Sequence, residues 1–531
     1  MFLTHDGLIS PIGPLRSRLG PHWEKFLAKL TVTHFPVVGP PKRAHMYETL
    51  TIAGVKCIRL PRTVAAKLTT IATVRVQFAP IRRIRARLGI DLYDDQKVVI
   101  KHIMQTALTP ARIAAGTASC ILNMEAGFGK TFIGAGLIMA TGLRTLWVTP
   151  KKPLRKQAID DLRLAFSDED GNCSIVIGGY GLPRKDGPPP AQQDVTVIII
   201  NSACAQNAAF FAGYSLIVLD EFPMYCSAKR RKIFQHATHA VFAMSATTED
   251  RLDGFDPIAH KAIAYDPIIR AATLVPPSDD VKFTRVVRVI RYTGPPEYTR
   301  NLRHEATQRL FMPYMHKQFV ADPARLNIAV DELVALYDWR GPDNIRHGIF
   351  IFAEELDILR VIRSAFIAAL KARNRADIVD NFAAFDAIGD DSSMFTGGLD
   401  DDAITSTIRD CRVLFTTYGY AGTGVSIRKM TAILFMTPRR SNMLQIIRRI
   451  QRRGSDLRIP RVVVDILDNA TKVRSQFADR RLAYAKSEFK QIDLIADTNG
   501  MQADPDIEPD SDDPDEDTVV APPALETDEY D

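Results

Sequence analysis

The sequence predicts an α/β protein with two tandem parallel-sheet domains, an N-terminal accessory region and a disordered acidic tail. Short apolar runs, typical of strands buried on both faces, alternate with helical patterns in two successive stretches of the chain. The 531 residues suffice for several domains, and a composition of 46% hydrophobic and 24% charged residues is ordinary for globular protein. The last segment has few residues that could enter a core, so we expect it to be disordered.

The expected boundaries follow from where this alternation begins and ends. In the first domain the apolar runs are residues 121–124, 145–149, 195–200, 216–219 and 241–244. In the second domain they are residues 348–352, 412–416, 432–437 and 462–466. The chain therefore divides into an accessory region (1–90), a first domain (91–270), a connector (271–320), a second domain (321–490) and a tail (491–531).

Charge is distributed unevenly along the chain. Residues 504–531 contain 13 acidic residues and no Lys or Arg, which leaves 68 basic against 49 acidic residues, a net charge of +19, in the rest. A body that basic favours a polyanionic partner such as nucleic acid, although a merely soluble basic protein would have the same composition. The basic run Arg82, Arg83, Arg85 and Arg87 is a candidate grip on duplex, or it packs beside the domains. The tail is interpreted as a solvated segment, with nucleic-acid mimicry or partner recruitment as alternatives.

Cysteine usage and the chain start bear on the compartment. The six cysteines form no CxxC pair and have no accompanying His cluster, so reduced thiols are expected rather than a zinc site. The first residues lack the features of a signal peptide, and no apolar stretch reaches about 18 residues. We expect a soluble intracellular protein of the cytoplasm or nucleus, without a membrane partner.

The strongest motif lies where the first apolar run meets a helical pattern. The run leads into a glycine-containing loop, and Lys130 and Thr131 then open an apolar-periodic helix. This order is typical of a phosphate loop, although Met124 stands where the full pattern has glycine. Lys130 would bind the β- and γ-phosphates of ATP, and the Thr131 hydroxyl would bind Mg²⁺. The expected nucleotide-binding residues of this loop are Glu125, Ala126, Gly127, Phe128, Gly129, Lys130 and Thr131.

A later apolar run, residues 216–219, ends in Asp220 and Glu221. Parallel sheets place ligands at the carboxyl ends of their strands, so both carboxylates are expected beside the phosphate loop. Asp220 would hold Mg²⁺, and Glu221 would polarise the attacking water as general base. An acidic pair after a strand is common, but its combination with the loop predicts an ATP hydrolase. A P-loop kinase or GTPase is the alternative at this point.

These motifs and several others resemble those of the superfamily 2 helicases over most of residues 90–455. Ser245, Ala246 and Thr247 are similar to the family's Ser-Ala-Thr element, which links the ATP state to domain movement. Gly424 lies in a segment that resembles the fifth motif, and is assigned to the same coupling. The resemblance thus implies that the two domains are RecA-like.

Residues 445–452 resemble the sixth helicase motif. By that match Arg449 and Arg452 point across the cleft at the γ-phosphate, where a guanidinium stabilises charge in the transition state. Arg448 stands where the family has glycine. The alternative for these arginines is a basic helix face that binds nucleic acid. Upstream, Gln96 resembles the glutamine that reads adenine, since its amide offers both a donor and an acceptor.

The resemblance implies a motor that uses ATP and Mg²⁺ to move along nucleic acid or to separate its strands. Residues 146–151 with Gln157, and residues 200–202, resemble segments that contact the nucleic-acid backbone. Residues 92–96 and 420–424 are similar to those of poxvirus transcript-release helicases and other helicases of large DNA viruses. This similarity favours DNA over RNA, with transcription or replication proteins as candidate partners. A non-unwinding translocase that displaces transcripts or proteins, and an inactive nucleic-acid-binding scaffold, are the alternatives.

Overall fold

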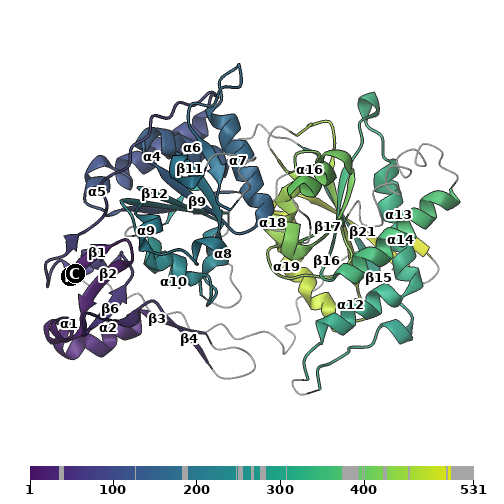
Figure 1. The fold of residues 1–531 in the computed structure, drawn as a ribbon. Helices are drawn as coiled ribbons and strands as arrows, with labels where there is room; N and C mark the ends of the chain where they lie inside the picture. Colours follow the sequence, from purple (N-terminus) through teal and green to yellow (C-terminus); the bar gives the residue numbers. More distant parts are fainter. Residues whose placement is uncertain are drawn as a thin grey trace.

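A computed structural model of the chain shows an N-terminal unit and two α/β domains (Figure 1). None of the helices in the described part of the chain has the length and apolarity that a membrane span requires. The described residues are 1–34, 41–125, 127–181, 189–246, 248, 255–264, 268–275, 283–305, 308–373, 394–397, 399, 401–421, 427–452, 455–497 and 500–503. The acidic segment 504–531, expected to be disordered, lies outside these ranges.

The first α/β domain contains a sheet of seven parallel strands, and the five apolar runs predicted for it all form strands. These strands are buried because helices cover both faces of the sheet. Their spatial order is β10 (Ile177–Gly179), β11 (Val195–Ile199), β9 (Thr145–Thr149), β12 (Leu216–Asp220), β13 (Ala240–Ser245), β8 (Ala118–Asn123) and β14 (Ile269–Arg270).

Two apolar cores lie on the two faces of this sheet. One face is covered by helices α4, α6 and α7, whose apolar side chains form one cluster with every second residue of the strands. The other face is covered by α8, α9 and α10 (Figure 1). The bounds are α4 (Asp94–Thr106), α6 (Lys130–Thr141), α7 (Lys152–Phe166), α8 (Ile200–Ala203), α9 (Ala208–Phe211) and α10 (Asp256–Ile263).

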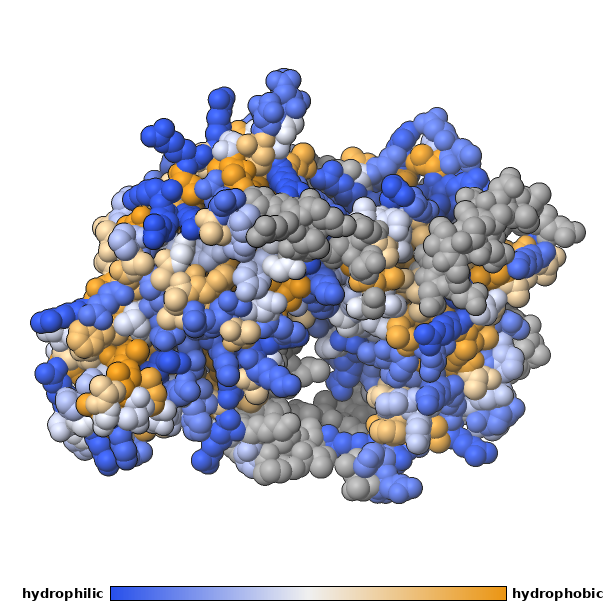
Figure 2. All heavy atoms as spheres, in the orientation of Figure 1, coloured by the Kyte–Doolittle hydropathy of each residue, from blue (hydrophilic) through white to orange (hydrophobic). Residues whose placement is uncertain are grey.

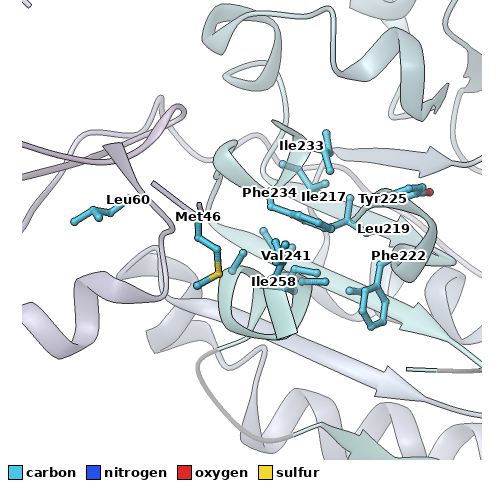
Figure 3. Packing of buried hydrophobic residues seen from close by; sticks show 14 of the residues in the cluster. Met46, Leu60, Ile217, Leu219, Phe222, Tyr225, Ile233, Phe234, Val241 and Ile258 are labelled. Atoms are coloured by element: carbon cyan, nitrogen blue, oxygen red, sulfur yellow. The ribbon is translucent and has the colours of Figure 1, made fainter. Parts of the chain in front are cut away.

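The N-terminal unit shares one of these cores with the first α/β domain. Figure 3 shows Met46 and Leu60 of the N-terminal unit beside Phe234, Val241 and Ile258, all buried in one continuous cluster. The unit has a five-stranded sheet, a separate hairpin and three helices. Its elements are β5 (Glu48–Ile52), β6 (Val55–Leu60), β2 (Gly7–Pro11), β1 (Phe2–Thr4) and β7 (Arg75–Val76) in sheet order, with the hairpin β3 (Thr31–His34) and β4 (Lys42–His45) and helices α1 (Ile12–Leu19), α2 (Trp23–Lys29) and α3 (Val64–Leu68).

The second α/β domain contains a sheet of eight strands, of which only β22 is antiparallel to its neighbour. The four apolar runs predicted here form β16, β18, β19 and β20. Helices α13 (Pro323–Asp338) and α14 (Leu356–Ala372) pack against this sheet. The strand order is β17 (Met394–Phe395), β18 (Val413–Thr417), β16 (Gly348–Ala353), β19 (Met430–Phe435), β20 (Arg461–Asp468), β15 (Arg285–Tyr292), β21 (Lys490–Asp497) and β22 (Gly500–Ala503).

Two strands of this sheet lie wholly or mostly outside the range 321–490 that was expected for the second domain. Strand β15 comes from the segment 271–320, expected to be a connector, yet it pairs with β20 and β21 inside the sheet. Strand β21 occupies residues assigned to the tail from 491 onward. In β15 buried Val287 and Val289 are separated by Arg288, which pairs with Glu332 at 2.8 Å. The sequence of β15 is therefore not an apolar run of the kind that predicted the other strands, because it contains charged side chains whose partners lie elsewhere in the fold.

Candidate active site

A cleft of about 350 Å³ lies between the two α/β domains. The surface between the domains is hollowed in Figure 2, with hydrophilic residues on both sides of the hollow. Most of the expected site residues of the two domains face this one cleft. From the first domain these are Gln96, Gly127, Phe128, Gly129, Lys130, Thr131, Asp220 and Glu221, and from the second domain Arg449 and Arg452.

The phosphate loop connects β8 to the first turn of α6. Gly127 and Gly129 have φ angles of +95° and +91°, a left-handed region that glycine enters without a steric cost. A Cβ atom at Gly129 would lie 2.4 Å from Nε2 of Gln96. The loop can therefore turn its N–H groups toward an anion at the start of α6, as the sequence predicts.

Gln96 supports the loop from helix α4. Its Nε2 donates to the carbonyl of Phe128 at 2.9 Å, and its Oε1 accepts from the N–H of Tyr93 at 3.1 Å. The side chain is almost fully buried, at 2% exposure. Both ends of this amide are thus hydrogen-bonded within the protein.

Glu221 and Lys130 form an ion pair at the centre of the cleft. Ser245 Oγ, at the end of β13, donates to the other carboxylate oxygen of Glu221 at 2.9 Å. Burial is the largest single influence and would raise the pKa of Glu221, but the charge and hydrogen bond of Lys130, together with Arg449 and Ser245, hold the pKa below its usual value. Glu221 also has a φ of +49°, a strained conformation for a residue other than glycine, such as occurs at functional sites. This geometry links the expected base to both the phosphate loop and the Ser-Ala-Thr element.

Asp220 lies at the carboxyl end of β12, and its Oδ1 is buried with no hydrogen-bond partner in the described part of the chain. Burial raises the pKa of Asp220 to about 7, against the opposing effect of Lys130. A buried carboxylate oxygen without a partner fits a cation ligand, and Thr131 lines the same cleft. No group of three or more His, Cys, Asp or Glu residues that could hold a metal occurs among the described residues.

The second domain contributes the two arginines of the sixth motif. Arg449 lies in the short helix η8 (Arg448–Ile450), and only 3% of it is exposed. Burial and the neighbouring charge of Arg452 lower the pKa of Arg449 to about 9, and burial lowers that of Arg452 to about 10. The carboxylates of Asp220 and Glu221 act in the opposite direction on Arg449, so the cleft brings both acids and arginines of the two domains close together.

Three features in and around the cleft were not predicted from the sequence. Two are contacts between the domains, and the third is a carboxylate, Asp161, that lines the cleft. Arg448 Nη2 forms an ion pair at 2.8 Å with Glu125 of the phosphate loop, in the other domain. Lys151, just before α7, donates to the carbonyls of Gly419 and Tyr420, the latter at 3.1 Å. The only sequence signal for the first contact is that Arg448 replaces the glycine of the related motif.

Asp161 of α7 adds a further carboxylate to the cleft, beside the charge of Arg452. Burial raises its pKa, and Gln157 Nε2 donates to its Oδ2 at 3.4 Å. Gln157, expected to contact nucleic acid, therefore lines the cleft. Asn201, expected in a similar role, accepts a hydrogen bond from Arg230 Nε at 3.2 Å.

Of the remaining expected residues, one lies within the described residues and three lie outside them. Ala246 directly follows β13. Ala126, Thr247 and Gly424 lie outside the described residues.

The sequence and fold are similar to those of known nucleic-acid enzymes. The model of the family described as "Type III restriction enzyme, res subunit" matches residues 89–250. Curated relatives named "Putative ATP-dependent RNA helicase QP509L", from isolates of African swine fever virus, are 27% identical over 485 residues, which cover 90% of this chain and 89% of the relative.

Two solved structures are also similar. A type ISP restriction-modification enzyme, LlaBIII, bound to DNA has a TM-score of 0.48 and 13% identity, covering 75% of this chain and 30% of its own. Dbp5 of S. cerevisiae bound to RNA and ADP BeF3 has a TM-score of 0.46 and 11% identity, covering 77% and 94%.

Two tandem RecA-like domains with this cleft, and these sequence relatives, indicate an ATP hydrolase that is similar to the superfamily 2 helicases. The chain is similar in particular to a helicase of a large DNA virus, which confirms the resemblance to such viral helicases inferred from short motifs.

Proposed function

We propose that the chain couples ATP hydrolysis in this cleft to movement along nucleic acid or to separation of its strands. The observation that carries the proposal is the composition of the cleft. A lysine and two carboxylates from one domain face two arginines from the other, so its chemistry depends on how the domains are apposed. A site divided in this way can transmit the state of the nucleotide to the relative position of two domains.

In the proposed mechanism, Lys130 exchanges its ion pair with Glu221 for the phosphates of ATP. When Lys130 moves to the phosphates, its positive charge no longer lowers the pKa of Glu221. Burial then raises this pKa and makes the carboxylate a stronger base for the attacking water. The Lys130–Glu221 pair would thus keep Glu221 inactive until ATP is bound.

Mg²⁺, when bound with ATP, would neutralise phosphate charge and polarise the transferred group. Asp220 and the Thr131 hydroxyl are the residues that would hold it. The otherwise unpartnered Oδ1 of Asp220 supports this role. The adenine would lie toward Gln96, whose amide has a second N–H and a second oxygen lone pair beyond its bonds to Phe128 and Tyr93.

Arg449 and Arg452 would stabilise the charge that develops on the transferred phosphate. Removal of such a guanidinium lowers kcat by about 10³–10⁵-fold in related phosphoryl-transfer enzymes. The experiment is ATP hydrolysis and ATP binding by Arg449→Ala. We expect hydrolysis to fall by at least about 10³-fold and ATP binding to weaken much less. Hydrolysis within about tenfold of wild type would overturn the assignment.

The nucleic acid itself is proposed to be DNA, from the similarity of short motifs to large-DNA-virus helicases. The names of the viral relatives favour RNA instead. ATPase rates with single-stranded DNA, duplex DNA and RNA as separate stimulators decide between them. A strand-separation assay beside a displacement assay distinguishes unwinding from translocation alone. Absence of stimulation by all three nucleic acids would contradict the motor function and favour the inactive scaffold or an unrelated ATPase.

A further inference from the structure

Residues 79–90, here called the strap, join the N-terminal unit to the first α/β domain without helix or strand, apart from a β-bridge at Arg83 and bends at residues 89–90. Ile81 packs against the core on the side of α6 and α7, and from residue 84 onward the even-numbered side chains do so, namely Ile84, Ala86, Leu88 and Ile90. Successive side chains of an extended chain point to opposite sides. The packing of the even positions therefore directs the odd positions outward.

The outward positions of the strap are arginines. Arg83, Arg85 and Arg87 are exposed at two-residue intervals, about 6.6 Å apart in an extended chain, and Arg82 is exposed beside them. Within the described ranges no carboxylate forms an ion pair with any of the four. Arg83 alone uses its guanidinium within the protein, donating to the carbonyl of Thr141 at 3.2 Å. The strap thus presents a regular, uncompensated row of positive charge.

The row is held in place by its backbone. Ile84 N–H donates to Gly142 and Gly89 N–H to Ala165, both at 2.9 Å. At Arg87 the backbone forms two hydrogen bonds with Ser174 Oγ, at 2.7 and 3.1 Å. Because these bonds fix the chain, binding a ligand would cost little backbone entropy.

The arginines of the strap lie by the amino ends of the strands, away from the cleft, and only its last residue, Ile90, lines the cleft. The strap's partners Gly142, Arg144 and Ser215 directly precede β9 and β12, at the amino ends of these strands. The cleft residues Asp220 and Glu221 lie at the carboxyl end of β12. The strap arginines therefore do not belong to the ATP site.

We infer that the strap is a second nucleic-acid contact, which binds the phosphate backbone independently of nucleotide sequence and apart from the motor cleft. A fixed row of arginines at regular intervals matches the repeating phosphates of a nucleic-acid backbone, and contacts with phosphates carry no sequence information. The choice of nucleic acid as the polyanion rests on the proposed function.

The acidic segment 504–531 is the competing occupant. The place where this segment joins the fold argues against its occupying the strap. Strand β22 leads into the segment from the outer edge of the second sheet, in the other α/β domain. At the C-terminal end of the strap, Gly89 lies against the backbone of Ser167 and Asp168 in an acidic turn. Positive potential should therefore be strongest from Arg82 to Arg85.

The test is a triple variant of the full chain, Arg82→Gln, Arg85→Gln and Arg87→Gln. Its matched control carries Arg16→Gln, Lys25→Gln and Lys29→Gln, which remove the same charge from exposed positions on α1 and α2. Affinity for duplex DNA and for RNA is measured by fluorescence anisotropy over a series of salt concentrations. Thermal unfolding of both variants establishes that they are folded.

For the strap variant we expect weaker binding and a salt dependence whose slope falls by about 0.9 for each lost duplex phosphate contact, up to about 2.7 in total. The ATPase rate at saturating nucleic acid should equal that of wild type. Equal affinity and slope in strap and control variants would overturn the inference. Failure of the wild-type chain to bind any nucleic acid would instead contradict the proposed function.

A deletion of residues 504–531, made in both the wild-type and strap backgrounds, tests the competing occupant. If the strap binds nucleic acid directly, the deletion should change affinity equally in both backgrounds. A gain in affinity confined to the wild-type background would show that the acidic segment occupies the strap, and would overturn the inference.

Discussion

Glu221→Gln is the substitution that tests most directly how the cleft works. Glutamine has nearly the shape of glutamate and can still accept from Ser245 Oγ, but it cannot take a proton from water. Loss of a general base costs about 10²–10⁴-fold in rate, which corresponds to about 2.7–5.5 kcal/mol in the barrier. We therefore expect the rate of a single turnover of ATP to fall by that factor.

The same substitution removes the partner of Lys130. Only 5% of the Glu221 side chain and 17% of the Lys130 side chain are exposed, so the lysine charge would be left largely buried without its partner. Breaking a fully buried pair costs about 3–5 kcal/mol. Partial exposure of Lys130 and the nearby Asp220 reduce this to about 1–3 kcal/mol of lost stability. Bound ATP would give Lys130 a new partner and restore most of that loss.

The assay combines rapid-quench hydrolysis with thermal unfolding in the presence and absence of a non-hydrolysable ATP analogue. The difference in unfolding temperature between Glu221→Gln and wild type should shrink when the analogue is bound. Glu169→Gln, at an exposed position after α7, removes one carboxylate and should leave both measurements unchanged. A loss of less than tenfold in hydrolysis would refute the role as base. An unchanged stability difference on binding the analogue would refute the exchange of Lys130 from Glu221 to phosphate.

Three further perturbations follow from the same geometry. Because the pKa of Asp220 is raised to about 7, protonation should weaken Mg²⁺ binding below that pH. The Mg²⁺ concentration for half-maximal ATPase should therefore be higher one pH unit below this value than one unit above it, and equal values would contradict the role. Gly129→Ala forces a Cβ at a φ of +91° to within 2.4 Å of a neighbouring amide nitrogen, so calorimetry should show more than about 1 kcal/mol of lost stability, and an unchanged melt would contradict the loop geometry. Arg448→Gly breaks a pair whose partner Glu125 is 62% exposed, so a double-mutant cycle with Glu125→Gln on ATP affinity should give a coupling of about 0.2–1 kcal/mol, and a coupling well above this range would contradict a solvent-screened pair.

The sequence was informative wherever burial alone determined the structure. Strands buried on both faces, such as β9 and β12, appear in the sequence as apolar runs, and Asp220, which ends β12, lines the cleft. Strand β15 was missed because Arg288 and Arg291 lie between its buried residues, each with a carboxylate partner, Glu332 and Asp493. A tertiary ion pair that allows a charged residue in a sheet is not visible in the local pattern.

The candidate site was predictable only as far as its motifs extend. The positions of Lys130, Asp220 and Glu221 follow from strand ends, which are local features. Contacts between the domains are different, because they depend on which surfaces meet. Lys151 in one domain and the carbonyl of Tyr420 in the other are 269 residues apart in the sequence, and neither carries a signal that indicates the other.

The position of β15 has a consequence for synthesis of the chain on the ribosome. This strand leaves the exit tunnel early, but its two neighbours, β20 and β21, are the last long strands to be made. Both edges of β15 are open until β20 has emerged, and the edge that pairs with β21 is open until residue 497 has emerged, so β15 can pair with another nascent chain. The first α/β domain can complete its seven strands long before that. A truncated product that stops short of β21 would therefore carry a finished front half and an aggregation-prone rear half.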